Sequence, residues 1–183
     1  ARMRATIDDA LAAAIRAPAV RERIAHGVSR ERIGKELALM CASGNAAYCL
    51  EQLADAGLFA AVFGEAAPTR AVPVVRALEP LFAHFAVTHV LWGVLAAVLL
   101  DARDLREPTA HVSAVQRAVM TTLKLSSAEK NAVLQLHQAF DYLAAKDGHL
   151  ATRLEYGRFL LLGRELWLAA LLLFIAHQAP DAT

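Results

Sequence analysis

Apolar residues recur at helical spacing along most of this chain, and few helix-breaking residues interrupt them. Ile33, Leu37, Met40 and Cys41, for example, share one side of a helix that Ser29 can cap. Hydrophobic residues make up 57% of the chain and charged residues 20%, a balance that excludes disorder caused by charge. Since only nine glycines and six prolines are present in 183 residues, the pattern predicts an all-α fold.

Capping residues and turns predict where the helices begin and end. Thr6 or Asp8 can cap the first helix, Ser126 with Glu129 forms a capping box, and Gly57 is a candidate left-handed cap. Helices are expected at residues 8–16, 18–27, 30–42, 46–56, 58–63, 74–86, 88–102, 126–146, 152–163 and from 164 onward, with another after Thr109.

Residues 64–73 are the one stretch that combines proline with little periodicity. We place a domain boundary there, between a helical neck at residues 1–64 and a helical body and tail at residues 65–183. Two apolar runs follow the boundary, at residues 90–100 and 166–176. Each is shorter than the roughly 20 residues that a bilayer requires, so both are predicted to be buried core helices, without membrane contact.

The two cysteines, Cys41 and Cys49, lie eight residues apart in a helical region, which favours reduced thiols over a disulfide or a metal pair. Together with the absence of a secretory signal pattern, this predicts an intracellular protein. Cytoplasm, nucleus and mitochondrion are not distinguished by these features.

Catalytic motifs were sought and not found. The chain has no glycine-rich phosphate loop, no Cys-x-x-Cys, and no Asp-x-Asp pair that would hold two metal ions. Asp101 and Asp104 lie beside arginines in a charged loop. The histidines are scattered: His84 and His89 would lie on different helix faces, His137 is expected beside Gln138 on a polar face, and His111 in a first helical turn.

Positive charge is concentrated near the N-terminus, where residues 1–36 carry eight Lys or Arg against five acids. The net charge is only +1, so any RNA contact must be local or shared with another domain. Flexible or forked cations suit phosphate oxygens. The RNA-binding candidates are Lys124, Lys130, Arg153, Arg158 and Arg164.

The most informative segment is Ser29-Arg30-Glu31-Arg32-Ile33-Gly34-Lys35-Glu36-Leu37. It resembles a motif of the class II tRNA nucleotidyltransferase and poly(A) polymerase family, in which Ser or Pro is followed by x-Glu-Arg-Ile/Val-x-x-Glu-Leu at a helix start. Residues 1–8 resemble the end of a segment that follows the family's nucleotide-selecting motif. Residues 88–100, 124–140 and 153–175 are similar in pattern to the body of the yeast and plant branch.

This resemblance implies a division of labour. An absent catalytic head would bind Mg²⁺ and transfer nucleotides from CTP and ATP, while this chain, which binds no cofactor of its own, would hold tRNA. The chain alone should then be inactive, although it would be part of a CCA-adding enzyme. The resemblance also implies that Ser29, Arg30, Glu31, Arg32 and Glu36 brace the protein template that selects CTP and then ATP.

Two further interpretations remain open. The same motif fits the neck and body of a poly(A) polymerase, and the modest charge also allows a helical interaction scaffold with no RNA role. The motif's charges could equally be a solvated helix start with Glu31–Lys35 and Arg32–Glu36 pairs. The bracing hypothesis predicts instead that Glu36 is paired with Arg32 and partly buried against the preceding helices.

Overall fold

The computed structural model describes residues 8–63, 68–101 and 123–178. Within these ranges the chain forms helices and no strand, which confirms the predicted all-α fold. The helices are α1 (Asp9–Arg16), α2 (Pro18–Gly27), α3 (Arg30–Ala42), α4 (Ala46–Asp55), α5 (Phe59–Phe63), α6 (Pro68–His84), α7 (Val90–Asp101), α9 (Ser127–Ala144), α10 (Arg153–Gly163) and α11 (Trp167–Gln178). A 3₁₀ turn, Arg164–Leu166, joins the last two.

Local capping chemistry starts several of these helices where the sequence predicts. The Asp8 carboxylate accepts the Leu11 amide, and Pro18 occupies the beginning of α2, where its missing N–H costs nothing. Capping boxes, formed by Ser126 with Glu129 and by Thr152 with Glu155, start α9 and α10. Gly57 adopts the predicted left-handed conformation, with φ +69°.

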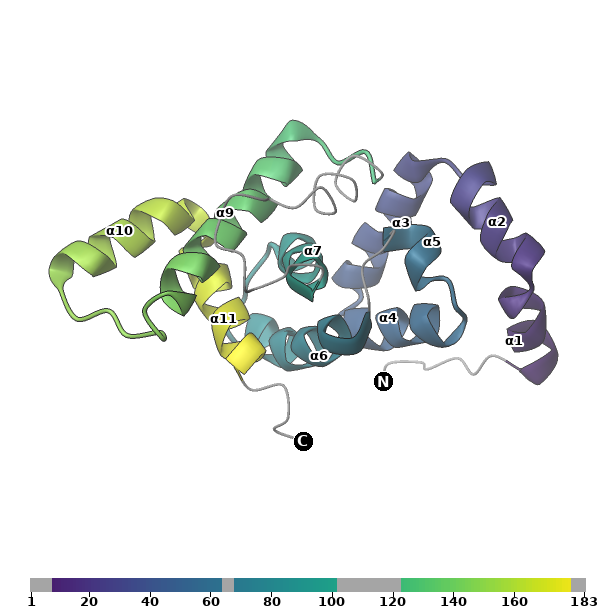
Figure 1. Ribbon diagram of the computed structural model, residues 1–183, viewed down its shortest axis with the longest axis horizontal. Helices are drawn as coiled ribbons and strands as arrows, with labels where there is room; N and C mark the ends of the chain where they lie inside the picture. The colour runs from purple at the N-terminus through teal and green to yellow at the C-terminus, as the bar shows by residue number, and fades with distance from the viewer. Residues whose placement is uncertain (1–7, 64–67, 102–122, 179–183) are drawn as a thin grey trace.

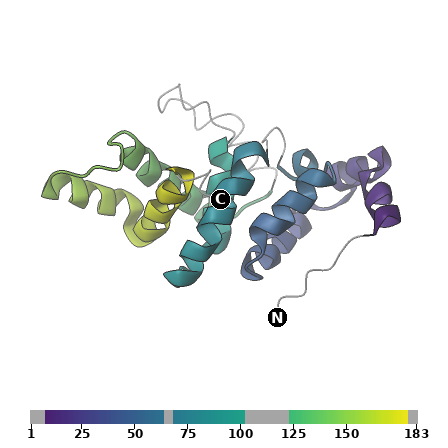
Figure 2. The same ribbon diagram turned by 90° about the horizontal axis from the view of Figure 1, so that it is seen from below.

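Helix α7 lies at the centre of the fold, with α3, α6 and α9 around it (Figure 1). Every residue of α7 from Gly93 to Leu100 is buried, and α11 buries six residues between Ala169 and Ala176. Both predicted core runs are therefore confirmed as buried. The molecule is elongated, with α1 and α2 at one end and α10 at the other, as the perpendicular view also shows (Figure 2).

One stretch of the described chain, Arg153–Gln178, is long and apolar enough to cross a membrane. Half of its most apolar window is buried inside the molecule. The stretch is also not one straight helix, because Arg164 has φ 47° and breaks it between α10 and α11. Because of this burial and this break, the stretch is only weak evidence for a membrane-spanning helix.

The sequence predicts that the helix after the boundary begins at residue 74. This is wrong, because α6 begins at Pro68 and continues through Pro73 and Pro80. A proline inside a helix normally costs about 3 kcal/mol. Burial outweighs that cost here, since Ala71, Val72, Val74, Val75 and Leu78 are all buried in the core. The functional division into neck and body stays a prediction, although the buried core runs through both parts.

Helix α4 ties these two parts together. The Glu79 carboxylate of α6 accepts the Ala46 amide at the start of α4, where Asn45 provides no side-chain cap. Glu51 of α4 also forms an ion pair with Arg76 of α6. At the other end of α4, Arg16 Nε of α1 donates to the Asp55 carbonyl at 3.1 Å. Helix α4 therefore has an anionic partner at its N-terminus and a cationic partner at its C-terminus, as its dipole favours.

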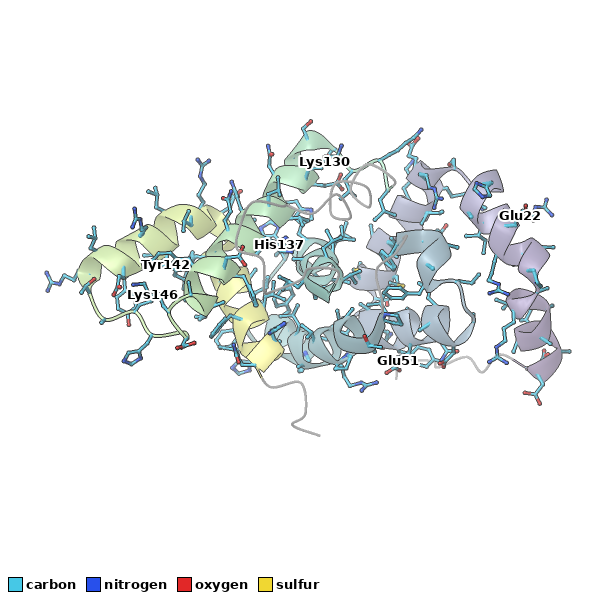
Figure 3. All side chains as sticks on the ribbon, viewed as in Figure 1. Glu22, Glu51, Lys130, His137, Tyr142 and Lys146 are labelled. Atoms are coloured by element: carbon cyan, nitrogen blue, oxygen red, sulfur yellow. The ribbon has the colours of Figure 1, made fainter. Side chains whose placement is uncertain are left out.

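One sequence prediction about a histidine, that for His137, is corrected by the fold. His137 is buried, not on a polar face, and its Nε2 donates to the Ala96 carbonyl of α7 at 3.0 Å (Figure 3). It shares an arc of α9 with Val133, Leu136 and Phe140, which explains its burial. His84 and His89 belong to different elements: His84 ends α6, and His89 stacks on Trp92 at the start of α7. His111, Thr109 and Asp104 lie outside the described residues.

Candidate nucleic-acid interface

The predicted neck motif begins α3, as expected from its sequence. Ser29 has extended backbone angles, and its hydroxyl accepts the Arg32 amide at 3.3 Å. Ile33, Leu37 and Cys41 then point into the core at one-turn intervals. This inward stripe leaves the motif's charged residues distributed over the remaining faces of the helix.

Arg30 is half-buried and joins three helices. Its Nη2 donates to the carbonyl of Ala25 at 2.6 Å, and its Nη1 donates to the carbonyl of Ala61 at 2.8 Å. Ala25 lies in the last turn of α2 and Ala61 in the short α5, where main-chain carbonyls lack partners within the helix. A guanidinium suits both, because its planar fork carries several donors and its charge opposes the helix dipoles.

We call this arrangement of Arg30, Ala25 and Ala61 the Arg30 clamp. The sequence left Arg30 either as a bracing residue or as part of a solvated helix start, and the structure shows its guanidinium bonded to α2 and α5. The position of Arg30 in the first turn of α3 indicates a partner elsewhere, because a cation at a helix N-terminus is electrostatically unfavourable. The identity of that partner could not be read from the sequence, because Ala61 is 31 residues away.

The face of α3 that carries Glu31 and Lys35 opens on a small cleft. These two side chains form an exposed ion pair at 3.1 Å, which confirms the predicted i,i+4 contact. A cleft of about 240 Å³ separates them from Lys124 and Glu129, and its floor is made of leucines from α3, α7 and the segment before α9. Residues of the neck and of the body therefore line the same cleft.

Lys124 reaches this cleft from a backbone conformation that lysine seldom adopts. Its φ is 49°, and its side chain is exposed between the buried Leu123 and Leu125. Such a left-handed, non-glycine residue costs about 1 kcal/mol or more, and it persists only where the surroundings fix it. Here the two flanking leucines supply that constraint and hold the lysine at the surface.

A second exposed face of α3, about 100° around the helix from Glu31 and Lys35, carries Arg32 and Glu36. Both are exposed, and no ion pair joins them in the described part of the chain. The prediction that Glu36 is paired and partly buried is therefore wrong. These side chains instead border an apolar groove of about 440 Å³ between α1, α2, α3, α4 and α5. Because the groove is open, water solvates their charged ends and neither needs an ionic partner.

Cys41 and Cys49 are free thiols, as the sequence predicts. Burial raises the pKa of Cys41 to about 12, and the nearby Glu79 carboxylate contributes in the same direction. The pKa of Cys49 is also raised, first by burial and then by Glu79. No three His, Cys, Asp or Glu side chains of the described ranges gather as metal ligands. These thiols are consequently poor nucleophiles and suit a packing role.

The five predicted RNA-binding cations fall into two groups. Lys124 lies just before α9 and lines the cleft beside α3, and Lys130 lies near the start of α9 (Figure 3). Arg153 and Arg158 belong to α10, which lies at one extremity of the molecule (Figure 1), whereas Arg164 begins the 3₁₀ turn that packs on α9 and α11. The structure therefore brings Lys124 to the neck motif, whereas Arg153 and Arg158 lie on the helix at the other end of the molecule.

Residues 6–69 match a protein-family model described as "Probable RNA and SrmB- binding site of polymerase A". The match spans α1 to α5 and so includes the Arg30 clamp, the Glu31–Lys35 face and the apolar groove. No curated protein and no solved structure matches the chain. The match supports an RNA-binding region related to polymerase A-like nucleotidyltransferases, and it does not reach the cations of α9 and α10.

Proposed function

We propose that this chain is the tRNA-binding neck and body of a CCA-adding nucleotidyltransferase. The observation that carries the proposal is the Arg30 clamp, which lies inside the segment matching an RNA-binding family region. The clamp fixes the first turn of α3 against α2 and α5, so the exposed charges of the motif project from a rigid base. Nucleotide transfer, with its Mg²⁺, CTP and ATP, is assigned to a catalytic head of the same polypeptide.

In this proposal the two charged faces of α3 have different tasks. Lys35 and Lys124 line the cleft at the junction of neck and body, and Lys130 follows the lining residue Glu129, so all three can contact RNA phosphates there. Arg32 and Glu36 are exposed on the adjacent face and are free to brace the nucleotide-selecting template of the head. Arg30 acts indirectly, because its donors already bond to the chain's own carbonyls.

The contact with RNA should be modest and salt-sensitive. Each phosphate that a lysine neutralises contributes a slope of about 0.7 to 0.9 in the logarithm of affinity against the logarithm of salt concentration. Three lysines around one cleft therefore predict a shallow slope of about 2 to 3. A much steeper slope would indicate a larger basic surface than this one.

Titration of fluorescently labelled tRNA against the purified chain tests the proposal. Binding should weaken with salt as described, and Lys124→Glu should reduce it while leaving the thermal unfolding temperature nearly unchanged. Arg23→Glu, the same change of charge on the exposed surface of α2, is the matched control and should leave binding nearly unchanged. Absence of tRNA binding at low salt would contradict the proposal and favour the helical scaffold.

The family description names polymerase A, so a poly(A) polymerase neck is the second candidate. Oligoadenylate of matched length distinguishes the two in the same assay. A neck that serves CCA addition should prefer a tRNA acceptor arm to oligoadenylate, whereas a poly(A) polymerase neck should bind single-stranded RNA at least as well.

A further inference from the structure

The outer face of α10 is apolar and uncovered. Leu154 is 79% exposed, Leu161 73%, Tyr156 55% and Leu160 46%. The inner face packs on α9 and the chain after it, and buries Phe159 and Gly163. Helix α10 also lies at the end of the elongated molecule in both views (Figures 1 and 2). A helix that is apolar on both faces is normally covered on both, so its outer face indicates an interaction surface.

The spacing on this face suits a second helix. Leu154, Gly157 and Leu161 stand at positions i, i+3 and i+7 and form one stripe. A Cβ added at Gly157 would meet no atom within 4 Å, so the middle of the stripe is open. The glycine allows a neighbouring helix axis to approach closely, while a leucine on either side can interdigitate with it.

The charges around the stripe have one sign. Arg153 and Arg158 of α10 are exposed, and neither makes an ion pair with the described residues. The acid of the same helix, Glu155, is engaged at its inner side, where it accepts Lys146 Nζ at 2.8 Å and the amides of Ala151 and Thr152. The stripe therefore has cationic borders that no acid within α10 balances.

We propose that the outer face of α10 binds an amphipathic helix of a partner protein whose apolar stripe is bordered by carboxylates. The leucine spacing supplies the packing, and the two arginines of α10 supply charge complementarity with positions equivalent to e and g of a coiled coil. This inference does not depend on the tRNA proposal, since it concerns residues outside the matched segment.

Other occupants fit these observations less well. A second copy of the same face would set arginines against arginines along the seam. RNA would pair with the arginines but leave Leu154 and Leu161 in water. A bilayer would accept the leucines, but the stripe spans roughly 10 Å from its first to its last leucine, which is short for an interfacial helix.

The proposal is tested with the full chain and a labelled synthetic peptide of three heptads, with Leu at a and d and Glu at e and g. Glu–Glu repulsion prevents this peptide from pairing with itself at neutral pH. The matched peptide carries Lys in place of those Glu residues. Fluorescence anisotropy measures both, and circular dichroism verifies that each protein variant remains folded.

The Glu peptide should bind at least about tenfold more tightly than the Lys peptide. Leu161→Glu should weaken binding of the Glu peptide about tenfold or more. Gly157→Leu should weaken it equally, because the added side chain fills the open position without an internal clash. Leu39→Glu is the control, because Leu39 is 66% exposed on α3, away from this face. The double variant Arg153→Glu/Arg158→Glu should reverse the preference toward the Lys peptide.

Three results would overturn the proposal. The first is equal binding of both peptides, or binding of neither. The second is co-sedimentation of the chain with phosphatidylserine-containing vesicles that Leu161→Glu abolishes, which would assign the face to a membrane. The third is binding of oligouridylate that the same leucine variant abolishes, which would assign the face to RNA.

Discussion

Removal of the Arg30 clamp should destabilise the chain far more than removal of the neighbouring cation. Arg30→Ala deletes two hydrogen bonds from a charged donor, each contributing about 1.5 to 3 kcal/mol when partly buried. Water can reach both carbonyls after the change, and α3 loses an unfavourable cation at its N-terminus, which offsets about 0.3 to 1 kcal/mol. The expected net loss is about 2 to 3 kcal/mol.

Arg32→Ala is the matched control, because Arg32 also lies in the first turn of α3 but is exposed and makes no ion pair in the described chain. Its free energy of unfolding should change by less than about 0.5 kcal/mol, and so should that of Glu36→Ala. Arg30→Lys should fall between, at about 1 kcal/mol, because one ammonium cannot match a planar fork that spans two carbonyls.

Urea unfolding followed by far-ultraviolet circular dichroism measures all four variants. If Arg30→Ala lies within 0.5 kcal/mol of Arg32→Ala, the clamp contributes nothing and the bracing argument loses its structural basis. If Glu36→Ala costs as much as Arg30→Ala, Glu36 has a partner that its exposed position does not show.

Further predictions concern packing, protonation and the thiols. Gly93→Ala should cost about 1 to 3 kcal/mol in urea unfolding, because its Cβ would lie 2.5 Å from the Phe82 ring, whereas Gly157→Ala should be neutral or stabilising; equal effects would contradict this. The pKa of Glu155 is lowered from 4.5 to about 2, mainly by Lys146, so its stabilising effect is complete above pH 4.5 and is lost as the pH falls through about 2. In Glu155→Gln the unfolding temperature should therefore vary less with pH between these two values. A pH dependence equal to that of the unmodified chain would refute this prediction. Iodoacetamide at pH 8 should not modify folded Cys41, whose pKa is about 12, and should modify Cys49 slowly; mass spectrometry of intact and unfolded protein checks both.

The sequence predicted the helix starts well because capping is local chemistry. Ser29, Ser126 and Thr152 each bond to an amide three residues ahead, so a short window contains all of the information. Helix α6 was predicted too short for the opposite reason. Its two internal prolines are local signals, whereas the burial that outweighs them comes from distant helices.

The site was predicted less completely than the fold. The motif located α3 and the Glu31–Lys35 pair, but the partners of Arg30 lie in helices that only tertiary structure places beside it. Glu36 was predicted to be partly buried, and it is exposed. The i,i+4 pattern shows that Arg32 and Glu36 are neighbours on a helix, but it does not show whether another helix covers them. The burial of His137 could have been predicted, since it falls in the same arc of α9 as Val133 and Phe140.

Hydrogen–deuterium exchange of the chain, with and without tRNA, tests most directly whether RNA lies at the junction of neck and body. The account predicts slower exchange on tRNA binding in residues 31–38 of α3 and residues 123–130, which line or adjoin the shared cleft. Exchange in α1, at the end of the molecule, should not change. Protection confined to α10, or no protection anywhere, would contradict the account.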